Sequence, residues 1–382
     1  MIERKTMTTD ILVGSQTLRE IVSRFGNHLL QHPMATIPRH NPTRKEASML
    51  AKTTHWLFAT NTLLCFLLMS LCGCSTTRIS PENVMEVISR VTKTDCQSQL
   101  KELVELGPRF SGDADQTETT LSYLENRLKT MGYTTYRESA GQWLGVDQYN
   151  LMAEIRGSVS PEIVIELGAH YDTVKNCVGA DDNGTGVVGV LEAARVLKNA
   201  VPAKTVRFCF FAAEEIGLIG SRAHVDRITE NKQSSVEGLI NLEMIGYSTH
   251  QPNSQNAPIR IPILVSLPRE GNFILVAGNF SSGDLGNRFE SNIRRFVPNL
   301  EFYSANRIAG LFRDAARSDH SNYWDADIKS IMLTDTANLR NPNYHQPTDT
   351  YDTINFDFMS KVIQATVATM LEWGEFNLEH TP

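Results

Sequence analysis

The stretch IVIELGAHYDTVKNCVGADDNGTGVVGVLEAARVL, residues 163–197, decides the fold. It opens with an apolar run, Ile163–Leu167, continues as a polar loop, and ends with apolar residues spaced three or four apart from Val187 to Leu197. This order predicts a strand, a loop and a helix. A second apolar run, Val206–Phe211, completes a strand, helix, strand unit with parallel strands and a right-handed crossover. Such units build sheets that carry helices on both faces and place ligands at the carboxyl ends of the strands.

The rest of the chain repeats this alternation of strands and helices. Helical spacing marks residues 121–131, ending before Gly132, and a last helix that begins near Phe356. From residue 81 onward there is no repeat, low-complexity tract or long linker. The sequence therefore predicts one three-layer α/β/α domain, covering residues 74–382, with a mixed, mostly parallel central sheet. Further apolar runs of strand length lie at Leu239–Ile245, Ile261–Val265, Ile274–Val276 and Ile331–Leu333.

Composition narrows the range of partners. The 382 residues are 41% hydrophobic and 21% charged, which is ample for a large core. The net charge is −7 and the lysines and arginines are scattered, which argues against nucleic acid as a partner. Three cysteines lie outside the amino-terminal region: Cys96, Cys177 and Cys209. They do not form a Cys-x-x-Cys motif and three cannot all pair with one another, so no disulfide framework is expected.

The amino-terminal region has the layout of an export signal. Residues 56–71 form an uncharged apolar run that follows the basic residues Arg44, Lys45 and Lys52. The run is shorter than the roughly 20 residues of a stable membrane span, which favours a secretory signal peptide over residues 49–73. An uncleaved membrane anchor and a buried helix are the alternatives. Residues 1–48 are polar and are expected to lie outside the fold, and Met49 is an alternative start to Met1.

The end of this signal resembles the lipobox of bacterial lipoproteins. Residues 71–74 read Leu-Cys-Gly-Cys, and Cys74 stands where such proteins are lipidated and begin their mature chain. Ser75, rather than an aspartate, follows Cys74. The resemblance implies an exported protein with a lipid anchor in a membrane, in the outer membrane where the host has one, facing the periplasm or the cell surface.

Acidic and imidazole side chains stand at the ends of three predicted strands. Because parallel strands end at one edge of a sheet, these side chains should meet there. Burying carboxylates without partners costs free energy, so we expect cations to bind among these side chains. Histidine and carboxylate donors without cysteine suit a divalent metal such as Zn²⁺. The residues concerned are His170, Asp172, Asp181, Asp182, Glu214, Glu215 and Glu243, and the later segments Asp319-His320 and Tyr344-His345 add to them.

Two neighbouring features have simpler interpretations. Asp181 and Asn183 precede the helix that begins near Thr185, so their side chains can cap its free backbone N–H groups, and Asp181 is given no metal. Gly184 and Gly186 fit a turn, because no Lys-Ser or Lys-Thr pair follows to make a phosphate loop.

Five motifs together resemble the di-zinc aminopeptidases of metallopeptidase family twenty-eight. Each motif alone arises often by chance, whereas five in the family's order and near its spacing are specific. The resemblance covers roughly residues 85–375, and it implies the α/β fold of the zinc peptidases, of the phosphorylase/hydrolase-like type. The motifs are HYDT (170–173), GADDNGTG (179–186), AAEEIGLIGS (212–221), NLEMIG (241–246) and YHQPTDT (344–350), preceded by the lead-in LGPR (106–109), Asn150-Leu151 and Gly157.

The same resemblance implies two zinc ions and a ligand for each position. His170 and Glu243 would bind the first ion, Glu215 and His345 the second, and Asp182 would bridge both. Glu243 stands where most of the family has aspartate, which leaves the identity of the first metal open. Asp172 would hold the His170 imidazole in its binding orientation.

The family mechanism assigns the remaining roles. Glu214 resembles the general base, which takes a proton from a water bridged between the two zinc ions and passes it to the leaving amine. Tyr344 stands where some relatives place a phenol that stabilises the oxyanion. Asp319 and His320 should lie close to the site, contacting substrate or supporting the ligands, although a salt-bridge cluster with Arg317 would also explain them.

The predicted activity is therefore that of an aminopeptidase, a metal-dependent hydrolase that removes residues from peptides with a free amino terminus. Two alternatives stay open at this point. One is a glutaminyl-peptide cyclase of the same fold, which works with one zinc, and the other is a metal-free binding module.

Overall fold

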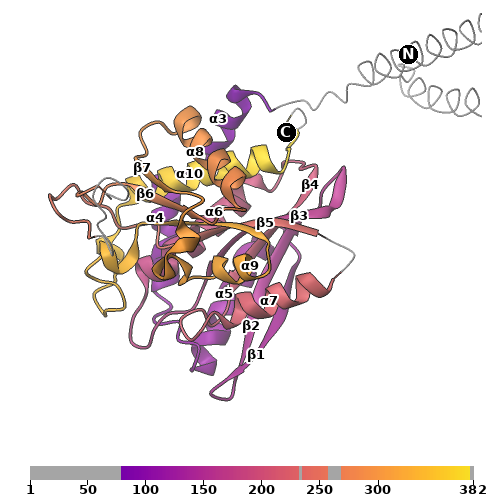
Figure 1. Cartoon of the computed structure of the whole chain (residues 1–382). Helices are drawn as coiled ribbons and strands as arrows, with labels where there is room; N and C mark the ends of the chain where they lie inside the picture. Colours follow the sequence, from indigo (N-terminus) through magenta and orange to yellow (C-terminus); the bar gives the residue numbers. More distant parts are fainter. Residues whose placement is uncertain (1–78, 232–234, 257–267, 379–382) are drawn as a thin grey trace, which may run out of the picture. The chain divides into compact units, whose positions relative to one another are not determined.

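The predicted strand, helix, strand unit is present in the computed structural model, which describes residues 79–231, 235–256 and 268–378 (Figure 1). Strand β3 (Ser160–His170) leads through a loop into helix α6 (Gly186–Leu197), and β4 (Lys204–Phe211) then pairs with β3 in parallel. Nearly every residue of β4 and α6 is buried, because both elements are covered on more than one side. His170 lies opposite Phe211, so the two strands end together.

The sheet has eight strands among the described residues and is mixed, with a parallel centre. Its order is β1-β2-β4-β3-β5-β8-β6-β7, and β4, β3, β5 and β8 run parallel to one another. Antiparallel pairing occurs between β1 and β2, between β2 and β4, and between β6 and β8. The predicted mixed, mostly parallel sheet is confirmed. The remaining strands are β1 (Thr135–Trp143), β2 (Val146–Ile155), β5 (Ser235–Glu243), β6 (Ile274–Gly278), β7 (Phe302–Ala305) and β8 (Lys329–Thr334).

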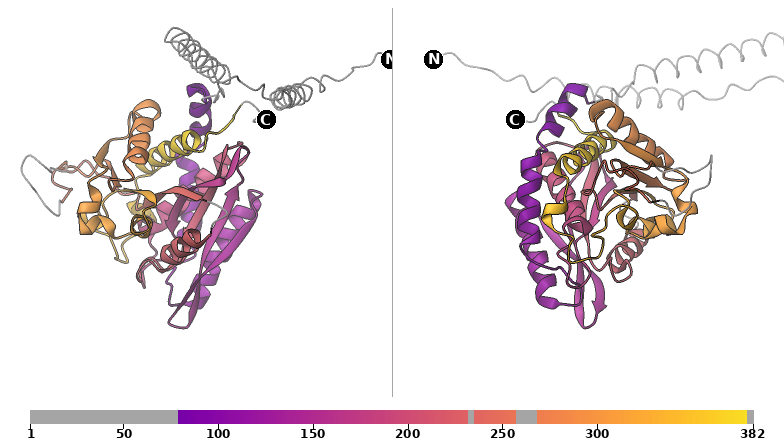
Figure 2. Two further views of the ribbon diagram at one scale, coloured as in Figure 1. Left: turned by 45° about the vertical axis from the view of Figure 1, so that its right-hand side comes forward. Right: turned by 90° about the vertical axis from the view of Figure 1, so that its left-hand side faces the viewer.

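Helices cover both faces of the sheet and complete the three layers (Figures 1 and 2). One face carries α5 (Ala114–Thr130), α6, α8 (Gly283–Phe296) and α10 (Phe356–Trp373), with α3 (Pro81–Ser89) and α4 (Lys93–Val104) packed behind α10 and α6. The other face carries α7 (Ile219–Glu230) and α9 (His320–Asp325). The helices predicted at 121–131 and from Phe356 are both present, and Gly132 follows the first with a φ of 83°.

Two predictions for strands have different outcomes. The apolar run Leu239–Ile245 forms β5 only as far as Glu243, because Met244 adopts a left-handed φ of 52° and turns the chain out of the sheet. The run Ile261–Val265 lies outside the described residues, as do the predictions for residues 1–78, including the signal peptide and Cys74. Within the described part of the chain, no helix combines the length and apolar character needed to cross a membrane.

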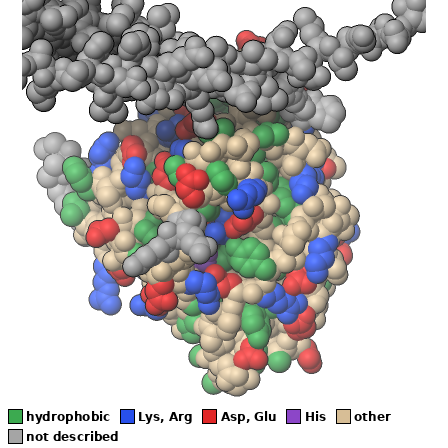
Figure 3. Space-filling view, turned by 90° about the vertical axis from the view of Figure 1, so that its right-hand side faces the viewer, with side chains coloured by type: hydrophobic (Ala, Val, Ile, Leu, Met, Phe, Trp, Pro, Cys, Tyr) green, Lys and Arg blue, Asp and Glu red, His purple; other side chains and the backbone are tan. Residues whose placement is uncertain are grey.

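The three cysteines of the described domain, Cys96, Cys177 and Cys209, are free and buried. On the face shown in Figure 3, basic side chains are interspersed with acidic ones, so this face has no large patch of one charge.

Candidate metal centre

The register of the central strands brings three acidic loops to one edge of the sheet. His170 ends β3, Glu243 ends β5, and β4 leads directly into Glu214 and Glu215. Pairing of β3 with β4 and β5 keeps these ends level, because His170 lies opposite Phe211 and Gly168 opposite Asn241. The prediction that these side chains share one sheet edge therefore agrees with the structure.

The backbone turns sharply beside the ligand candidates. Ala213, Met244 and His345 have φ values of 55°, 52° and 57°, in the left-handed region that residues other than glycine rarely adopt. Each such residue costs about 1–2 kcal/mol relative to a right-handed conformation. The turns direct Glu214, Glu243 and the His345 ring toward a common centre instead of along the strands, and strain of this kind is typical of functional sites.

One half of the centre is built around His170. Its Nε2 atom lies 3.5 Å from Asp182 Oδ1, 3.4 Å from Glu243 Oε2 and 3.9 Å from Glu214 Oε2. His170 is fully buried and Asp182 is 3% exposed, so these groups face one another away from bulk water.

The other half is built around His345. Its Nε2 atom lies 3.2 Å from Asp182 Oδ2 and 3.0 Å from Glu215 Oε2. Asp182 thus presents one carboxylate oxygen to each half. The five residues predicted as metal ligands therefore lie together, in two halves that share Asp182. We call these five residues, His170, Asp182, Glu215, Glu243 and His345, the metal group.

These residues fit divalent metal ions. Four of their buried polar atoms make no hydrogen bond: His170 Nε2, Asp182 Oδ2, Glu215 Oε1 and His345 Nε2. A buried polar atom without a hydrogen bond costs about 1–3 kcal/mol, and a metal ion that accepts these lone pairs would remove that cost. Imidazole nitrogens and carboxylate oxygens are the donors that zinc accepts in proteins.

The carboxylates also need a positive charge among them. Burial and, after it, the adjacent charge of Asp182 raise the pKa of Glu215 to about 7. Burial likewise raises the pKa of Glu214 well above its usual range, and Glu243 and Glu215 act in the same direction. Divalent cations would remove this repulsion and hold the carboxylates ionised.

Asp172 contacts both His170 and the loop that carries Glu214 and Glu215. Its Oδ1 atom lies 3.4 Å from His170 Nδ1, which leaves Nε2 directed at the centre. The same carboxylate accepts hydrogen bonds from the backbone N–H groups of Glu214, at 3.0 Å, and Glu215, at 3.3 Å. The predicted supporting position of Asp172 thus extends to the loop that follows β4.

Two further supporting residues were not assigned a role from the sequence. The Asp349 carboxylate accepts the backbone N–H groups of Asp181 and Asp182, at 2.9 and 3.0 Å. The buried Arg109 guanidinium donates to the carbonyls of Tyr171, Val178 and Gly179, at 2.7, 2.6 and 2.9 Å. Both residues belong to motifs named in the sequence analysis. Their partners are backbone groups, however, and the sequence does not indicate which backbone groups a side chain will contact.

The capping interpretation holds for Asn183 only. Asn183 Oδ1 accepts the backbone N–H of Gly186 at 3.2 Å, at the start of α6. Asp181 instead accepts the N–H of Gly246 at 3.0 Å and the side-chain amide of Asn341 at 2.7 Å. Asp181 therefore ties the loop after β5 to the site and stays outside the metal group.

Asp319 and His320 separate in space. Asp319 is fully buried near His170, Glu243 and Asp172, and burial raises the pKa of its carboxyl to about 7. His320 turns away: its Nε2 lies 2.7 Å from the Ala315 carbonyl oxygen and its ring packs edge-on against Trp324. No salt bridge joins either residue to Arg317 in the described structure, so the salt-bridge alternative is wrong.

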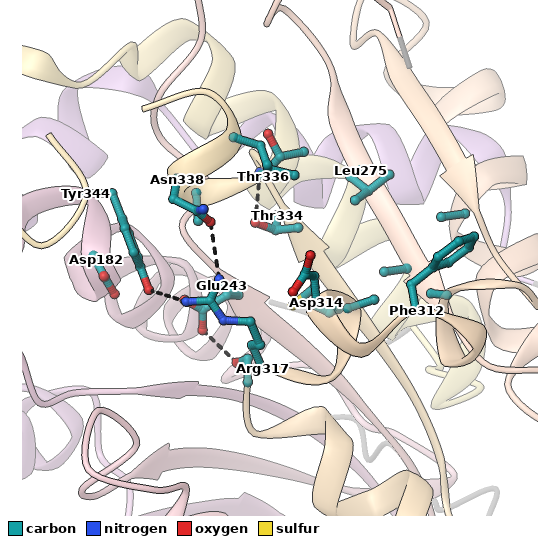
Figure 4. A pocket seen from close by; sticks show the side chains of 18 of the residues that line it. Asp182, Glu243, Leu275, Phe312, Asp314, Arg317, Thr334, Thr336, Asn338 and Tyr344 are labelled. Carbon is teal, nitrogen blue, oxygen red and sulfur yellow. Dashed lines mark hydrogen bonds between the residues drawn. The ribbon is translucent and has the colours of Figure 1, made fainter. Parts of the chain in front are cut away.

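Arg317 belongs to the site through Tyr344. Its guanidinium donates to the Tyr344 hydroxyl at 3.1 Å and to Asn338 Oδ1 at 3.3 Å (Figure 4). The Tyr344 ring stacks on His345 with centroids 3.8 Å apart. Tyr344 is thus held at the edge of the centre with its hydroxyl oriented by a cation.

A cavity of about 490 Å³ opens beside the metal group. Asp182, Glu214, Glu215, Glu243 and His345 line one side of it. The other side is largely apolar, with residues from β6, β8 and the segment before Arg317, including Leu275, Ala277, Ile308, Phe312 and Met332. Substrate can therefore reach the carboxylates from a partly apolar chamber.

A second grouping of Glu166, Cys209 and His224 does not make a metal site. Arg207 lies 2.6 Å from Glu166 Oε1, and the Tyr323 hydroxyl donates to Glu166 Oε2 at 2.6 Å. Burial opposes ionisation of Glu166, but His224 and Arg207 outweigh it and hold the pKa of this carboxyl at about 2. Its oxygens are already paired, and a nearby guanidinium disfavours another cation.

Comparison with known proteins identifies the family. The family model described as Peptidase family M28 matches residues 150–370. The Escherichia coli protein YfbL, described as uncharacterized, is 31% identical over 305 residues, covering 76% of this chain and 88% of that protein. The chain therefore belongs to Peptidase family M28, and the family resemblance seen in the sequence is confirmed.

Named relatives and solved structures extend this comparison. Aminopeptidase YwaD of Bacillus subtilis is 47% identical over 88 residues, which cover 23% of this chain and 19% of that protein. The structure of a zinc aminopeptidase from Bacillus subtilis superimposes with a TM-score of 0.59 at 16% identity, covering 74% of this chain and 95% of that chain. The structure of a glutaminyl cyclase from Bacteroides thetaiotaomicron superimposes with a TM-score of 0.54 at 17% identity, covering 73% of this chain and 97% of that chain. The predicted fold is confirmed, and the fold alone is common to both activities.

Proposed function

We propose that this family member is a zinc aminopeptidase that removes the first residue from peptides with a free amino terminus. The observation that carries the proposal is the position of Asp182 between two histidines, with one oxygen toward His170 and the other toward His345. His170, Asp182 and Glu243 would hold one ion, and Asp182, Glu215 and His345 the other.

Bound ions would lower the pKa of water toward neutrality and polarise the scissile carbonyl. Glu214 lines the cavity with its carboxylate facing the metal group. Its backbone is fixed by Asp172, so its side chain is placed to accept a proton from the attacking water and to deliver it to the leaving amine.

Tyr344, oriented by Arg317, supplies a hydrogen-bond donor for the negative charge that develops on the substrate oxygen. Because Arg317 donates to the Tyr344 oxygen, the phenol proton stays free to point elsewhere. Tyr344 lines the same cavity as Glu214 and can donate to the developing negative charge on the substrate oxygen.

Glu243 is compatible with this proposal although it is longer than the usual aspartate. Its Oε2 atom reaches within 3.4 Å of His170 Nε2, and the Ser318 hydroxyl donates to the same oxygen at 2.7 Å. The extra methylene is therefore accommodated, and Ser318 fixes the carboxylate within the first half of the centre.

Mass spectrometry of a peptide that begins with glutamine tests the reaction type. We expect the zinc-loaded protein to shorten it by one residue, because both halves of the centre have a full set of donors and a hydrolase of this design uses both. A product lighter only by ammonia would instead establish a cyclase. An acetylated copy of the peptide should remain intact, and its cleavage would contradict the need for a free amino terminus.

Metal analysis separates the enzyme from a binding module. A site in which buried nitrogen and oxygen donors lack other partners should retain metal through gentle purification. Less than about 0.2 zinc or other transition metal per chain would favour the module.

We further propose that the protein is an exported lipoprotein anchored to a membrane through Cys74. The support is the lipobox-like sequence at residues 71–74 after an uncharged apolar run. Cys74→Ser should move the protein from the membrane fraction to the soluble fraction, because only the thiol can carry the lipid. Cys96→Ser serves as the control and should leave the distribution unchanged. Membrane retention of the Cys74→Ser protein would contradict lipidation at this residue.

A further inference from the structure

One acidic residue that lines the cavity plays no part in the metal group. Asp314 lies in the short turn Arg313–Ala316, just before Arg317, and borders the same cavity as Glu214 and Glu243. No hydrogen bond or ion pair to the Asp314 side chain occurs within the described residues. Its carboxylate is therefore available to a ligand.

Asp314 stands on the apolar side of the cavity (Figure 4). The floor there comes from two antiparallel strands, in which Leu275 lies opposite Thr334 and Ala277 opposite Met332. Phe312, two residues before Asp314, adds an aromatic wall. The chamber beside the metal group is therefore an apolar slot with one negative charge.

The other charged side chains that line the cavity already have partners within the protein. Asp182, Glu214, Glu215 and Glu243 face the two histidines. Arg317 is held by Tyr344 and Asn338, on the side of the cavity where the metal group lies. Asp314 is thus the acidic group left for the side chain of a bound substrate.

We propose that Asp314 selects peptides whose first residue is lysine or arginine. This inference rests on the aminopeptidase function proposed above. The long alkyl stem of either side chain would pack against Leu275, Phe312 and Met332, while its charged end pairs with Asp314. Lysine and arginine are the side chains that bury an apolar stem and keep the charged head near water or an acid.

The sharpest test compares a lysyl with a norleucyl anilide, because norleucine has the lysine stem without the ammonium group. For the zinc-loaded protein we expect kcat/KM to favour the lysyl substrate. Asp314 is exposed, so Asp314→Asn should lower the lysyl to norleucyl ratio by about 5-fold, the upper size expected for an ion pair with an exposed carboxylate. Asp314→Glu, which keeps the charge, should retain most of the lysyl preference.

Two outcomes would overturn the proposal. One is an unmodified protein that cleaves the norleucyl substrate as well as the lysyl one. The other is an Asp314→Asn protein with an unchanged ratio, which would mean that Asp314 does not contact the side chain of the first residue. Calorimetric binding of lysinamide and norleucinamide gives a second readout. If neither anilide is cleaved, the aminopeptidase proposal fails, and the preference for lysinamide and its loss in Asp314→Asn still decide the role of Asp314.

Discussion

Replacing Glu214 by glutamine is expected to lower kcat at least about 10²-fold, the usual contribution of a general base. Glutamine has nearly the same shape but cannot accept the proton of the attacking water. The metal content should stay unchanged, because His170, Asp182, Glu243, Glu215 and His345 remain in place. Steady-state kinetics on an aminoacyl anilide and metal analysis of the same sample check both parts.

A matched control separates the base from general effects of charge. Glu301 is an exposed acid outside the cavity lining, and Glu301→Gln should leave kcat within about 2-fold of the unmodified protein, as surface substitutions usually do. Unchanged kcat in Glu214→Gln would remove Glu214 from the mechanism. Loss of metal in that variant would make it a ligand instead.

Replacing Asp182 by asparagine should weaken both metal sites together. Each of its oxygens faces a different histidine, at 3.5 Å for His170 and 3.2 Å for His345, so one amide nitrogen disrupts the shared ligand. We expect a loss of more than the roughly 10–100-fold in metal affinity that removal of a mere supporting group causes. Titration with a chromophoric zinc chelator measures this loss.

Comparing Asp182→Asn with His345→Ala tests whether Asp182 is shared between the two halves of the centre. His345 pairs with Asp182 and Glu215 and, within the described residues, with neither Glu243 nor Glu214, so its removal should release the ion of one half and leave the other. If Asp182→Asn and His345→Ala lost the same single ion, Asp182 would not be shared between the two halves.

The central part of the fold was predictable because its residues obey simple periodic rules. The β4 run is buried throughout, and α6 presents apolar residues at helical spacing, so both elements are visible in the sequence. The hairpin of β1 and β2 was not predicted. Strand β1 reads TYRESAGQW and has mostly exposed or half-exposed residues, because it forms the edge of the sheet and buries little apolar surface.

That the five candidate ligands lie together was predictable for a different reason. His170, Asp182, Glu215, Glu243 and His345 belong to motifs that carry a family resemblance, and the structure brings all five together. The contacts around these five residues were not predictable. The roles of Asp349 and Arg109 depend on backbone partners, and the orientation of His320 depends on the packing of its ring against Trp324. Such contacts follow from the three-dimensional path of the chain.

The left-handed turns at Ala213, Met244 and His345 have a consequence for the evolution of the whole domain. Together they cost about 3–6 kcal/mol, and a domain is typically stable by only about 5–15 kcal/mol. Favourable interactions elsewhere in the domain must offset this cost. A destabilising substitution at a buried position far from the site, such as Phe289 or Leu371, therefore leaves less stability before the domain unfolds.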